Sequence, residues 1–288
     1  MSTIGRVLLA TDLSKQSANL TNCFCSLCPD SETEVVLAHV VEEGEDADPG
    51  SSSYKKIIEQ LDLYQEKLTK AGYESVEVVL PKGDPERILH RVVDNMDCDL
   101  LMVASHGKGF FQRTFMGSTT HELAQATEVP LFIYKEDDDN DEITPGLDNL
   151  LETVMIATDF TKKSLDSLNL IRSLSEHVGR VLFVHVIERG DARSKGDFRE
   201  KYNNAELFLQ ELVDEMKIFG IKADFRIAKG TASKQIDAIC DQEDVTMVMI
   251  AKTGEEISNN TELGSTAENL ILNLDRSILL LPASEGDE

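Results

Sequence analysis

The sequence predicts an α/β chain made of two tandem, doubly wound, five-stranded parallel sheets of the Rossmann-like type. Three observations lead to this prediction: short apolar runs alternate with amphipathic stretches, the alternation occurs twice, and the same short motifs return at a near-constant offset. Unbroken apolar strands that alternate with helices are typical of a parallel sheet covered on both faces. Right-handed crossovers between such strands then produce the doubly wound order.

A recurrence of short motifs marks the duplication. The matching motifs lie 146 or 147 residues apart, which predicts a repeated unit of roughly 145 residues. The recurring motifs are Ala10-Thr11-Asp12 with Ala157-Thr158-Asp159, His39-Val40 with His185-Val186, Gly83 with Gly230, and Gly117-Ser118-Thr119 with Gly264-Ser265-Thr266. Because several motifs share one spacing, we interpret the chain as an internal duplication.

An acidic segment separates the two copies. A run of like charges from Glu136 to Glu142 is followed by Pro145-Gly146, a pattern typical of a solvated linker that ends in a turn. We therefore expect a first domain over residues 1–136, a linker over 137–149 and a second domain over 150–288. An acidic segment with a function of its own is the alternative interpretation.

Each strand of the first copy is a short apolar run, and the helices between them carry start or stop signals. The expected strands are Val7–Ala10, Val35–Val41, Val76–Leu80, Leu100–Ala104 and Leu131–Tyr134. The expected helices are Ser14–Leu27, Tyr54–Lys70, Pro85–Asn95 and Ser118–Ala126. Ser14 is a candidate N-cap, Gly72 ends the second helix, and Pro85 suits the first turn of the third. Apolar residues at helical spacing support the second helix.

The second copy repeats this alternation. Its expected strands are Val154–Ala157, Val181–Ile187, Ala223–Ala228, Thr246–Ile250 and Ile278–Leu281. The fifth strand of each copy is a sheet edge, and an open apolar edge invites aggregation. We therefore expect the two copies to pair through their fifth strands, as an internal pseudo-dimer.

Composition restricts the classes of partner. The 28 lysines and arginines against 53 aspartates and glutamates give a net charge of −25, which argues against nucleic acid and against an anionic membrane surface. A nucleotide remains compatible, because backbone amides can hold phosphates. Solubility is the plain explanation of the acidity, with a saline habitat as the alternative. Without a long apolar run or a signal-peptide pattern, we expect a cytoplasmic protein.

Three of the five cysteines, Cys23, Cys25 and Cys28, are clustered on the first expected helix. They do not all share one helical face, and a metal site would want a fourth ligand at a suitable spacing. We expect small buried or half-exposed thiols, with a metal or redox role as the alternative.

Candidate ligand-binding residues follow the first and fourth strands, because ligands of such sheets bind beyond the carboxyl ends of the strands. Asp12 ends the first strand, where a carboxylate can accept hydrogen bonds from ribose hydroxyls. The fourth strand ends in Ala104-Ser105-His106-Gly107, and after nine residues Gly117-Ser118 opens a helix. Glycines allow close approach of the backbone, and amides at a helix start receive phosphate oxygens. The residues therefore predict a nucleotide, with its sugar on Asp12 and its phosphates on the glycine loop.

This pattern resembles the universal stress proteins, specifically their tandem two-domain members. ATP-binding members of that family carry G-x-x-G, nine residues, and then G-S or G-T. Gly107 with Gly117-Ser118 matches all but the first glycine, and Gly254 with Gly264-Ser265 matches equally. The early aspartates, the His-Val pairs and the Gly83-Asp84-Pro85 turn are similar to the family too. The resemblance covers nearly the whole chain apart from the linker and both ends.

The resemblance implies a role for individual residues. The adenine and ribose would be held by Ala10, Asp12 and Val40, the ribose and phosphates would be lined by Val103, Ala104, His106 and Gly107, and the phosphates would be held by Gly117, Ser118 and Thr119. The matching residues of the second copy are Asp159, Gly254, Gly264 and Ser265. The implied cofactor is ATP or a related adenine nucleotide, with Mg²⁺ as a companion of its phosphates.

Two departures distinguish the copies from the family and from each other. Ala104 and Ala251 stand where ATP-binding relatives usually have glycine, and the added methyl could crowd a ligand pressed against the backbone. The first glycine loop contains Lys108 and Arg113 and no acid, whereas the second contains Glu255, Glu256 and Glu262 and no base. Because like charges oppose phosphate binding, we expect the nucleotide in the first copy. We expect the second loop to be a solvated turn of a partly degenerate site.

The histidines divide into three groups. His106 is expected beside the phosphates, because the glycine loop carries it. His39 and His185 fall within the second strand of each copy and are expected to be core residues with satisfied rings. His90 and His121 fall on polar-looking helices and are expected to face solvent.

These observations favour a cytoplasmic stress-response protein that binds ATP or another adenine nucleotide as a signal or switch, with at most slow hydrolysis. The chain carries no P-loop, and we see no convincing pair of nucleophile and base. The first alternative is a non-nucleotide scaffold for protein partners, with degenerate sites in both domains. The second is an adenylyl-transferring enzyme of related fold. We expect unidentified protein partners, and a homodimer is compatible with the sequence.

Overall fold

The computed structural model describes residues 4–44, 48–105, 118–135, 150–161, 165, 167–188, 190, 194–253 and 263–282. The chain forms two compact units, Ile4–Leu147 and Asp148–Glu288, and each is described by itself. The expected linker 137–149 lies outside the described residues, as do the segments 106–117 and 254–262 of the two glycine loops.

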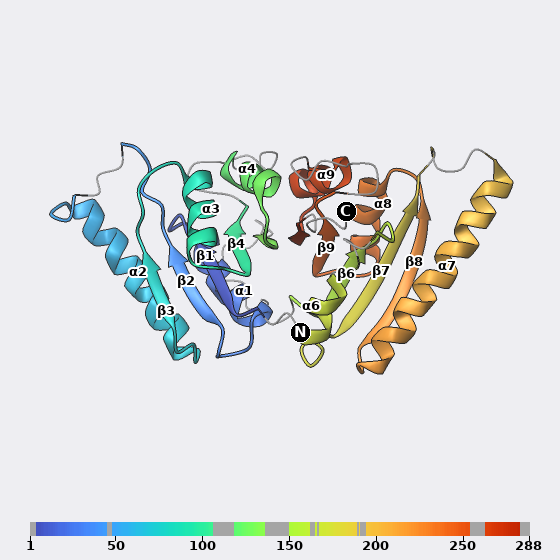
Figure 1. Ribbon diagram of the computed structural model, residues 1–288, viewed down its shortest axis with the longest axis horizontal. Coiled ribbons are helices and arrows are strands. Elements are labelled where there is room, and N and C mark those ends of the chain that lie inside the picture. Colours follow the sequence, from blue (N-terminus) through green and yellow to red (C-terminus); the bar gives the residue numbers. More distant parts are fainter. Residues whose placement is uncertain are drawn as a thin grey trace. The chain divides into compact units, whose positions relative to one another are not determined.

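The first unit is a five-stranded parallel sheet with the order β3-β2-β1-β4-β5 (Figure 1). Its elements follow the expected alternation of strand and helix. In chain order they are β1 (Arg6–Ala10), α1 (Lys15–Leu27), β2 (Glu34–Ala38), α2 (Ser52–Lys70), β3 (Val76–Val79), α3 (Pro85–Asn95), β4 (Leu100–Ala104), α4 (Ser118–Ala126) and β5 (Leu131–Tyr134).

The second unit repeats the architecture, with the parallel order β10-β9-β6-β7-β8. In chain order its elements are β6 (Thr153–Ala157), α6 (Ser167–Ser173), β7 (Arg180–Ile187), α7 (Lys195–Ile218), β8 (Lys222–Lys229), α8 (Ala232–Gln242), β9 (Met247–Ala251), α9 (Ser265–Asn273) and β10 (Ser277–Leu281). The predicted fold class, two tandem doubly wound sheets, is confirmed.

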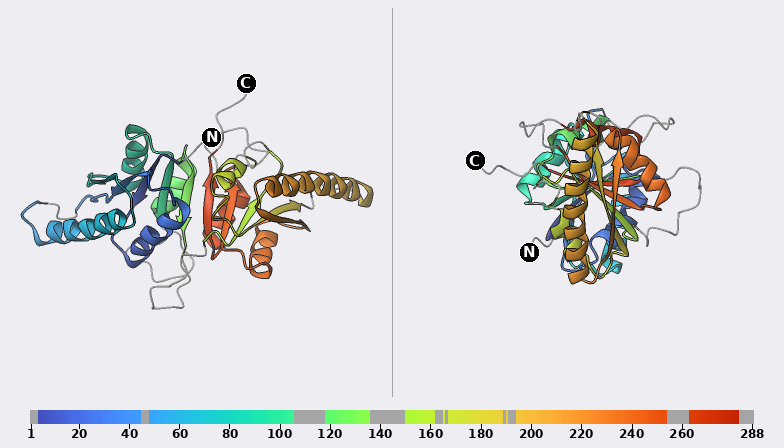
Figure 2. Two further views of the ribbon diagram at one scale, coloured as in Figure 1. Left: turned by 90° about the horizontal axis from the view of Figure 1, so that it is seen from below. Right: turned by 90° about the vertical axis from the view of Figure 1, so that its right-hand side faces the viewer.

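Helices cover both faces of each sheet (Figure 2). In the first unit α1 contacts α2 on one face, and α3 contacts α4 on the other. In the second unit α8 contacts α9, and α7 lies on the opposite face. The inner strands between these layers are apolar and mostly buried, as the unbroken apolar runs predicted, whereas the outer strands β3 and β8 are half-buried and carry charged residues.

The central strand of each sheet determines where a ligand can bind. In the first unit β1 pairs with β2 on one side and β4 on the other, so that Leu8 lies opposite Val36 and Leu101. In the second unit β6 lies between β7 and β9 in the same way. Because the chain order reverses at the β1–β4 and β6–β9 pairs, a crevice is expected beyond the carboxyl ends of these strands.

Short-range signals account for the helix starts. Ser14 accepts a hydrogen bond from the Ser17 amide, which confirms it as the N-cap of α1. Ser51 and Ser194 cap α2 and α7 in the same way. Asp84 caps α3 and precedes a proline at the first helical position, where a missing N–H costs nothing. These caps satisfy amides that have no partner within the helix.

Strand two of the first copy is shorter than predicted. β2 ends at Ala38 rather than Val41, although Val41 forms an isolated parallel bridge with Lys82. His39 therefore lies one residue beyond β2 instead of inside it, whereas His185 lies within β7 as expected.

Within the described residues, no helix is both long and apolar enough to cross a membrane.

The clustered cysteines of α1 are free thiols with different exposures. Cys23 and Cys28 are buried and Cys25 is half-buried, as the sequence predicted. Burial raises the pKa of the Cys25 and Cys28 thiols above the ordinary value. Among the described residues, no group of three or more histidine, cysteine or acidic side chains is placed to hold a metal ion.

Candidate ligand-binding site

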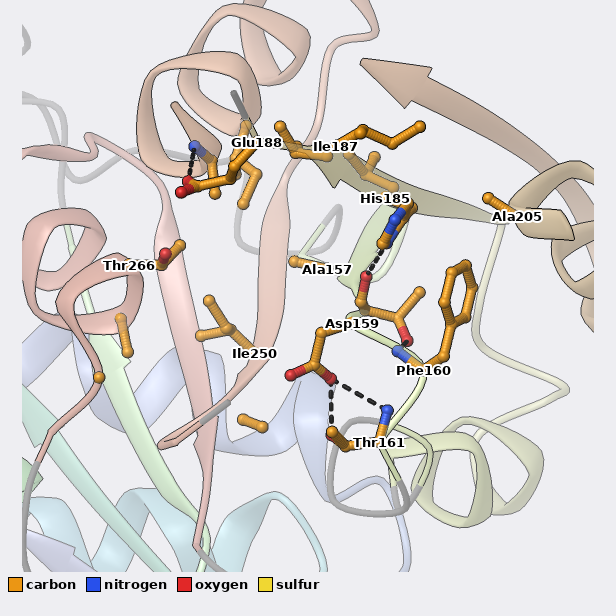
Figure 3. A pocket seen from close by; sticks show the side chains of 18 of the residues that line it. Ala157, Asp159, Phe160, Thr161, His185, Ile187, Glu188, Ala205, Ile250 and Thr266 are labelled. Carbon is orange, nitrogen blue, oxygen red and sulfur yellow. Dashed lines mark hydrogen bonds between the residues drawn. The ribbon is translucent and has the colours of Figure 1, made fainter. Parts of the chain in front are cut away.

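A cavity of about 650 Å³ lies at the carboxyl ends of β6, β7 and β9 in the second unit (Figure 3). The starts of α8 and α9 and one side of α7 complete its wall. This volume falls within the range of small-molecule sites, roughly 300–1,000 Å³. The cavity occupies the crevice that the strand order predicts.

The loop after β6 positions an aspartate at the mouth of this cavity. Thr158 Oγ1 accepts the Phe160 amide at 2.9 Å, and Asp159 Oδ1 accepts the Thr161 amide at 3.1 Å and the Thr161 hydroxyl at 2.6 Å. These bonds hold Phe160 in the left-handed region, with φ 68°. A bulky residue takes that conformation only where its surroundings impose it.

The Asp159 carboxylate uses one oxygen for the loop and turns the other toward the cavity. Both printed bonds from Thr161 end on Oδ1, and Figure 3 shows the second oxygen on the side away from Thr161. An oxygen in this position can accept a hydrogen bond from a ligand hydroxyl.

Three rings form one wall of the cavity. The Phe160 ring stacks on His185 with a centroid distance of 4.3 Å and an interplanar angle of 28°. Phe208 of α7 packs against Phe160 at 4.9 Å. His185 Nδ1 lies 2.9 Å from the Thr158 carbonyl oxygen, which fixes the ring against the loop. The expected satisfied ring of His185 is confirmed, and the structure adds that this ring lines the cavity.

The first unit reproduces the loop with different side chains. Leu13 takes a φ of 60° and donates its amide to Thr11 Oγ1 at 3.0 Å, while Asp12 Oδ1 accepts the Ser14 amide at 3.0 Å. His39 Nδ1 lies 2.8 Å from the Thr11 carbonyl oxygen, so this ring is also satisfied. The Asp12 carboxylate also accepts the hydroxyl of Ser17, whereas the Asp159 carboxylate accepts the hydroxyl of Thr161.

The Asp12 carboxylate also affects a nearby phenol of α2. The pKa of Tyr64 is raised, first by burial and then by the negative charge of Asp12. A phenol close to this carboxylate is a polar group that the sequence analysis did not single out.

The other predicted residues of the first unit gather at the same edge of the sheet. Ala10 ends β1, Val103 and Ala104 end β4, Val40 follows β2, and Thr119 lies in the first turn of α4. His106, Gly107 and Gly117 lie outside the described residues, and so does the side chain of Ser118. The first-unit site as a whole therefore stays a prediction.

Three predicted residues of the second copy line the cavity together: Asp159, Gly264 and Ser265. Gly264 is the N-cap residue of α9 and donates its amide to the Lys252 carbonyl at 2.8 Å. Gly254 lies outside the described residues. Ala251 also lines the cavity.

Several lining residues escaped the sequence analysis. Lys252 is only 2% exposed and stands directly before the second glycine loop. Glu188 follows β7 and accepts the Ala232 amide at the start of α8 at 2.8 Å. Lys201 and Phe208 come from the middle of α7. The position of Lys252 directly before the glycine loop could have marked it as a candidate in the sequence. No local sequence signal shows which residues of a long helix such as α7 face a cavity.

The expectation that His90 and His121 face solvent is wrong. Both side chains are half-buried, and Nε2 of His90 is buried without a hydrogen-bond partner among the residues that the structure describes. These histidines lie on α3 and α4, two helices that pack against each other.

Residues 3–135 match the Universal stress protein family. The first unit belongs to the universal stress protein family. Among curated proteins, none matches this sequence.

Solved structures extend the fold of the universal stress proteins over the second unit. A universal stress protein from Archaeoglobus fulgidus is 22% identical, with a TM-score of 0.74 over 98% of this chain and 99% of that chain. A functionally unknown protein from Pseudomonas aeruginosa is 14% identical, with a TM-score of 0.68 over 97% of this chain and 93% of that chain. At these identities the likeness concerns the fold.

Proposed function

We propose that this protein binds ATP or a related adenine nucleotide and acts in the stress response as a signal or switch rather than as an enzyme. The observation that carries the proposal is the aspartate loop at the carboxyl end of a central strand, which in the second unit binds the Phe160 amide through Thr158 and the Thr161 amide through Asp159. The loop around Asp12 has the same hydrogen bonds in the first unit. We place this role in the cytoplasm, with protein partners that recognise the occupied state.

The fit of a nucleotide follows from the chemistry of the strand ends. A ribose would donate to the carboxylate after the first strand, Asp12 or Asp159. The base would lie over the residues that follow the second strand, Val40 in the first unit. Phosphates would be received by amides at the start of α4 or α9, since a helix N-terminus favours negative charge. Mg²⁺ would arrive with the phosphates.

Charge favours the first unit for a triphosphate. Residues 105–117 contain two basic residues and no acidic one, a net charge of +2, whereas residues 252–264 contain one lysine and three glutamates, a net charge of −2. The lysine counted in the second segment is Lys252, which stands directly before the glycine loop. Because a triphosphate carries several negative charges, it is expected to bind where they are compensated.

Mass spectrometry of nucleotide released from freshly purified, denatured protein tests the proposal without a guess about the ligand.

Calorimetric titration of the parent and of site variants with ATP then locates the site. Asp12→Ala should weaken binding by roughly 1–3 kcal/mol, because a buried hydrogen bond loses its partner. Gly117→Leu should abolish most binding, whereas Gly264→Leu should change ATP binding little. Two equal ATP sites would contradict the preference for the first unit, and no binding at millimolar ATP would favour the scaffold alternative.

A further inference from the structure

We propose that the cavity of the second unit takes a nucleoside, a flat heterocycle with a ribose diol and no phosphate, while the first unit takes the nucleotide. This inference rests on the proposed function for the kind of base, and it assigns a different ligand class to the second site. It draws on the ring wall, the aspartate and the charges that surround the start of each helix.

The ring wall suits a flat heterocycle. Phe160, His185 and Phe208 line the cavity and pack on one another, with centroid distances of 4.3 Å and 4.9 Å. An aromatic ligand gains from offset or tilted contact with such rings beyond its burial. The first unit has Leu13 where the second has Phe160, at nearly the same φ, so this wall is a property of the second unit.

Asp159 supplies the group that recognises a diol. Its Oδ1 is engaged by Thr161, and its second oxygen lies on the cavity side (Figure 3). A carboxylate accepts two hydroxyl hydrogens without needing any positive charge on the ligand.

The helix starts around the cavity already carry carboxylates. Glu188 accepts the Ala232 amide, so the N-terminus of α8 is neutralised by the protein's own acid. Glu268 lies in the first turn of α9, whereas α4 has no acidic residue in its first turn. A phosphate at either helix start of the second unit would therefore meet a negative charge nearby.

The lining residues supply no surplus of positive charge. Among the described residues that line the cavity, Asp159 and Glu188 are acidic and Lys201 and Lys252 are basic, which leaves no net charge. A triphosphate would enter this site uncompensated, whereas a nucleoside needs no compensation.

Calorimetric titration of the full chain with adenosine, AMP and ATP tests this inference. We expect adenosine to bind the second unit at least tenfold more tightly than ATP binds there. Asp159→Asn keeps an acceptor for Thr161 but removes the charge, and Phe160→Leu copies the first unit at Leu13. Each should weaken adenosine binding about tenfold. Asp12→Asn should instead weaken ATP binding, and Glu206→Gln on the exposed surface of α7 is the inert control.

A variant that is expected to bind a ligand more tightly serves as a control, because a misfolded protein would not gain affinity. Glu188→Gln retains an acceptor for the Ala232 amide and removes one negative charge, so it should raise the affinity of AMP for the second unit several-fold. The inference is overturned if Asp159→Asn abolishes ATP binding. It is also overturned if Phe160→Leu leaves the affinity for adenosine unchanged. ATP binding at Asp12 with no adenosine binding refutes this inference alone. Adenosine binding at Asp159 with no ATP binding refutes the proposed function alone.

Discussion

At the scale of single residues, one threonine in each unit shapes the candidate site. Thr11 and Thr158 accept the amide two positions later and thereby hold Leu13 and Phe160 at positive φ. Such a conformation costs on the order of 1–3 kcal/mol and persists only where the surroundings fix it. The Thr-Asp pair that recurs in the sequence is therefore a loop-forming device as well as a candidate ligand contact.

Tyr73→Phe should destabilise the first unit by about 1–2 kcal/mol. The Tyr73 hydroxyl donates to the Cys28 carbonyl at 2.6 Å in a buried position, where an acceptor left without its donor is costly. Urea unfolding followed by circular dichroism measures the loss. Tyr54→Phe is the matched control, because the Tyr54 hydroxyl makes no hydrogen bond within the described part of the chain. Equal midpoints for the two variants would contradict the prediction.

The buried thiol of Cys240 should make the second unit less stable at high pH. Burial raises the pKa of Cys240 to about 12 from a model-compound value of 9.0. The folded state favours the neutral thiol, so this stabilisation is complete below pH 9 and disappears as the pH rises toward 12. Urea midpoints between pH 8 and 11 should fall less steeply in Cys240→Ala than in the parent. If the urea midpoints of the parent and of Cys240→Ala fell equally with pH, the thiol would not contribute to the pH dependence of stability.

At the scale of elements, equivalent helices begin in different ways. Asp84 caps α3 through its side chain, whereas Thr231 precedes α8 without a side-chain cap bond. The Ala232 amide of α8 is bound instead by Glu188, which follows β7. A local cap in one unit is thus replaced by a tertiary contact in the other, and that contact contributes a charge to the cavity wall.

Asp84→Ala should cost about 1 kcal/mol of stability, whereas Thr231→Ala should be nearly neutral. The difference arises because the first substitution removes a cap hydrogen bond and the second removes none. Chemical unfolding of the two variants under identical conditions measures it. A loss of more than about 1 kcal/mol in Thr231→Ala would show that its hydroxyl caps α8 after all.

At the scale of the whole molecule, we expect the two units to pair through β5 and β10. Each is the last strand of its sheet and is strongly apolar, and an open edge of this kind invites aggregation. Hydrogen exchange tests the prediction on the intact chain. Amides on the outer edges of Leu131–Tyr134 and Ser277–Leu281 should exchange as slowly as those of the central strands. Rapid exchange along these edges would contradict the pairing.

The sequence predicted most of the fold because its signals are local. Ser14 and Pro85 mark helix starts, and continuous apolar runs mark strands that are buried on both faces. The failures occurred where distant segments decide the outcome. His90 looks exposed on its own helix but is half-buried in the structure. β2 stops at Ala38 although the apolar run continues.

The sequence by itself determined the duplication, the parallel sheets and the position of Asp12 and Asp159 at the carboxyl ends of strands. Only the tertiary structure decided that Phe160, His185 and Phe208 form one wall and that Lys252 is buried beside Gly264. The physical reason is the range of the interactions. The presence of strands and of side-chain caps follows from residues close in the chain, whereas the shape and charge of a cavity depend on which face of α7 packs over the loop after β6.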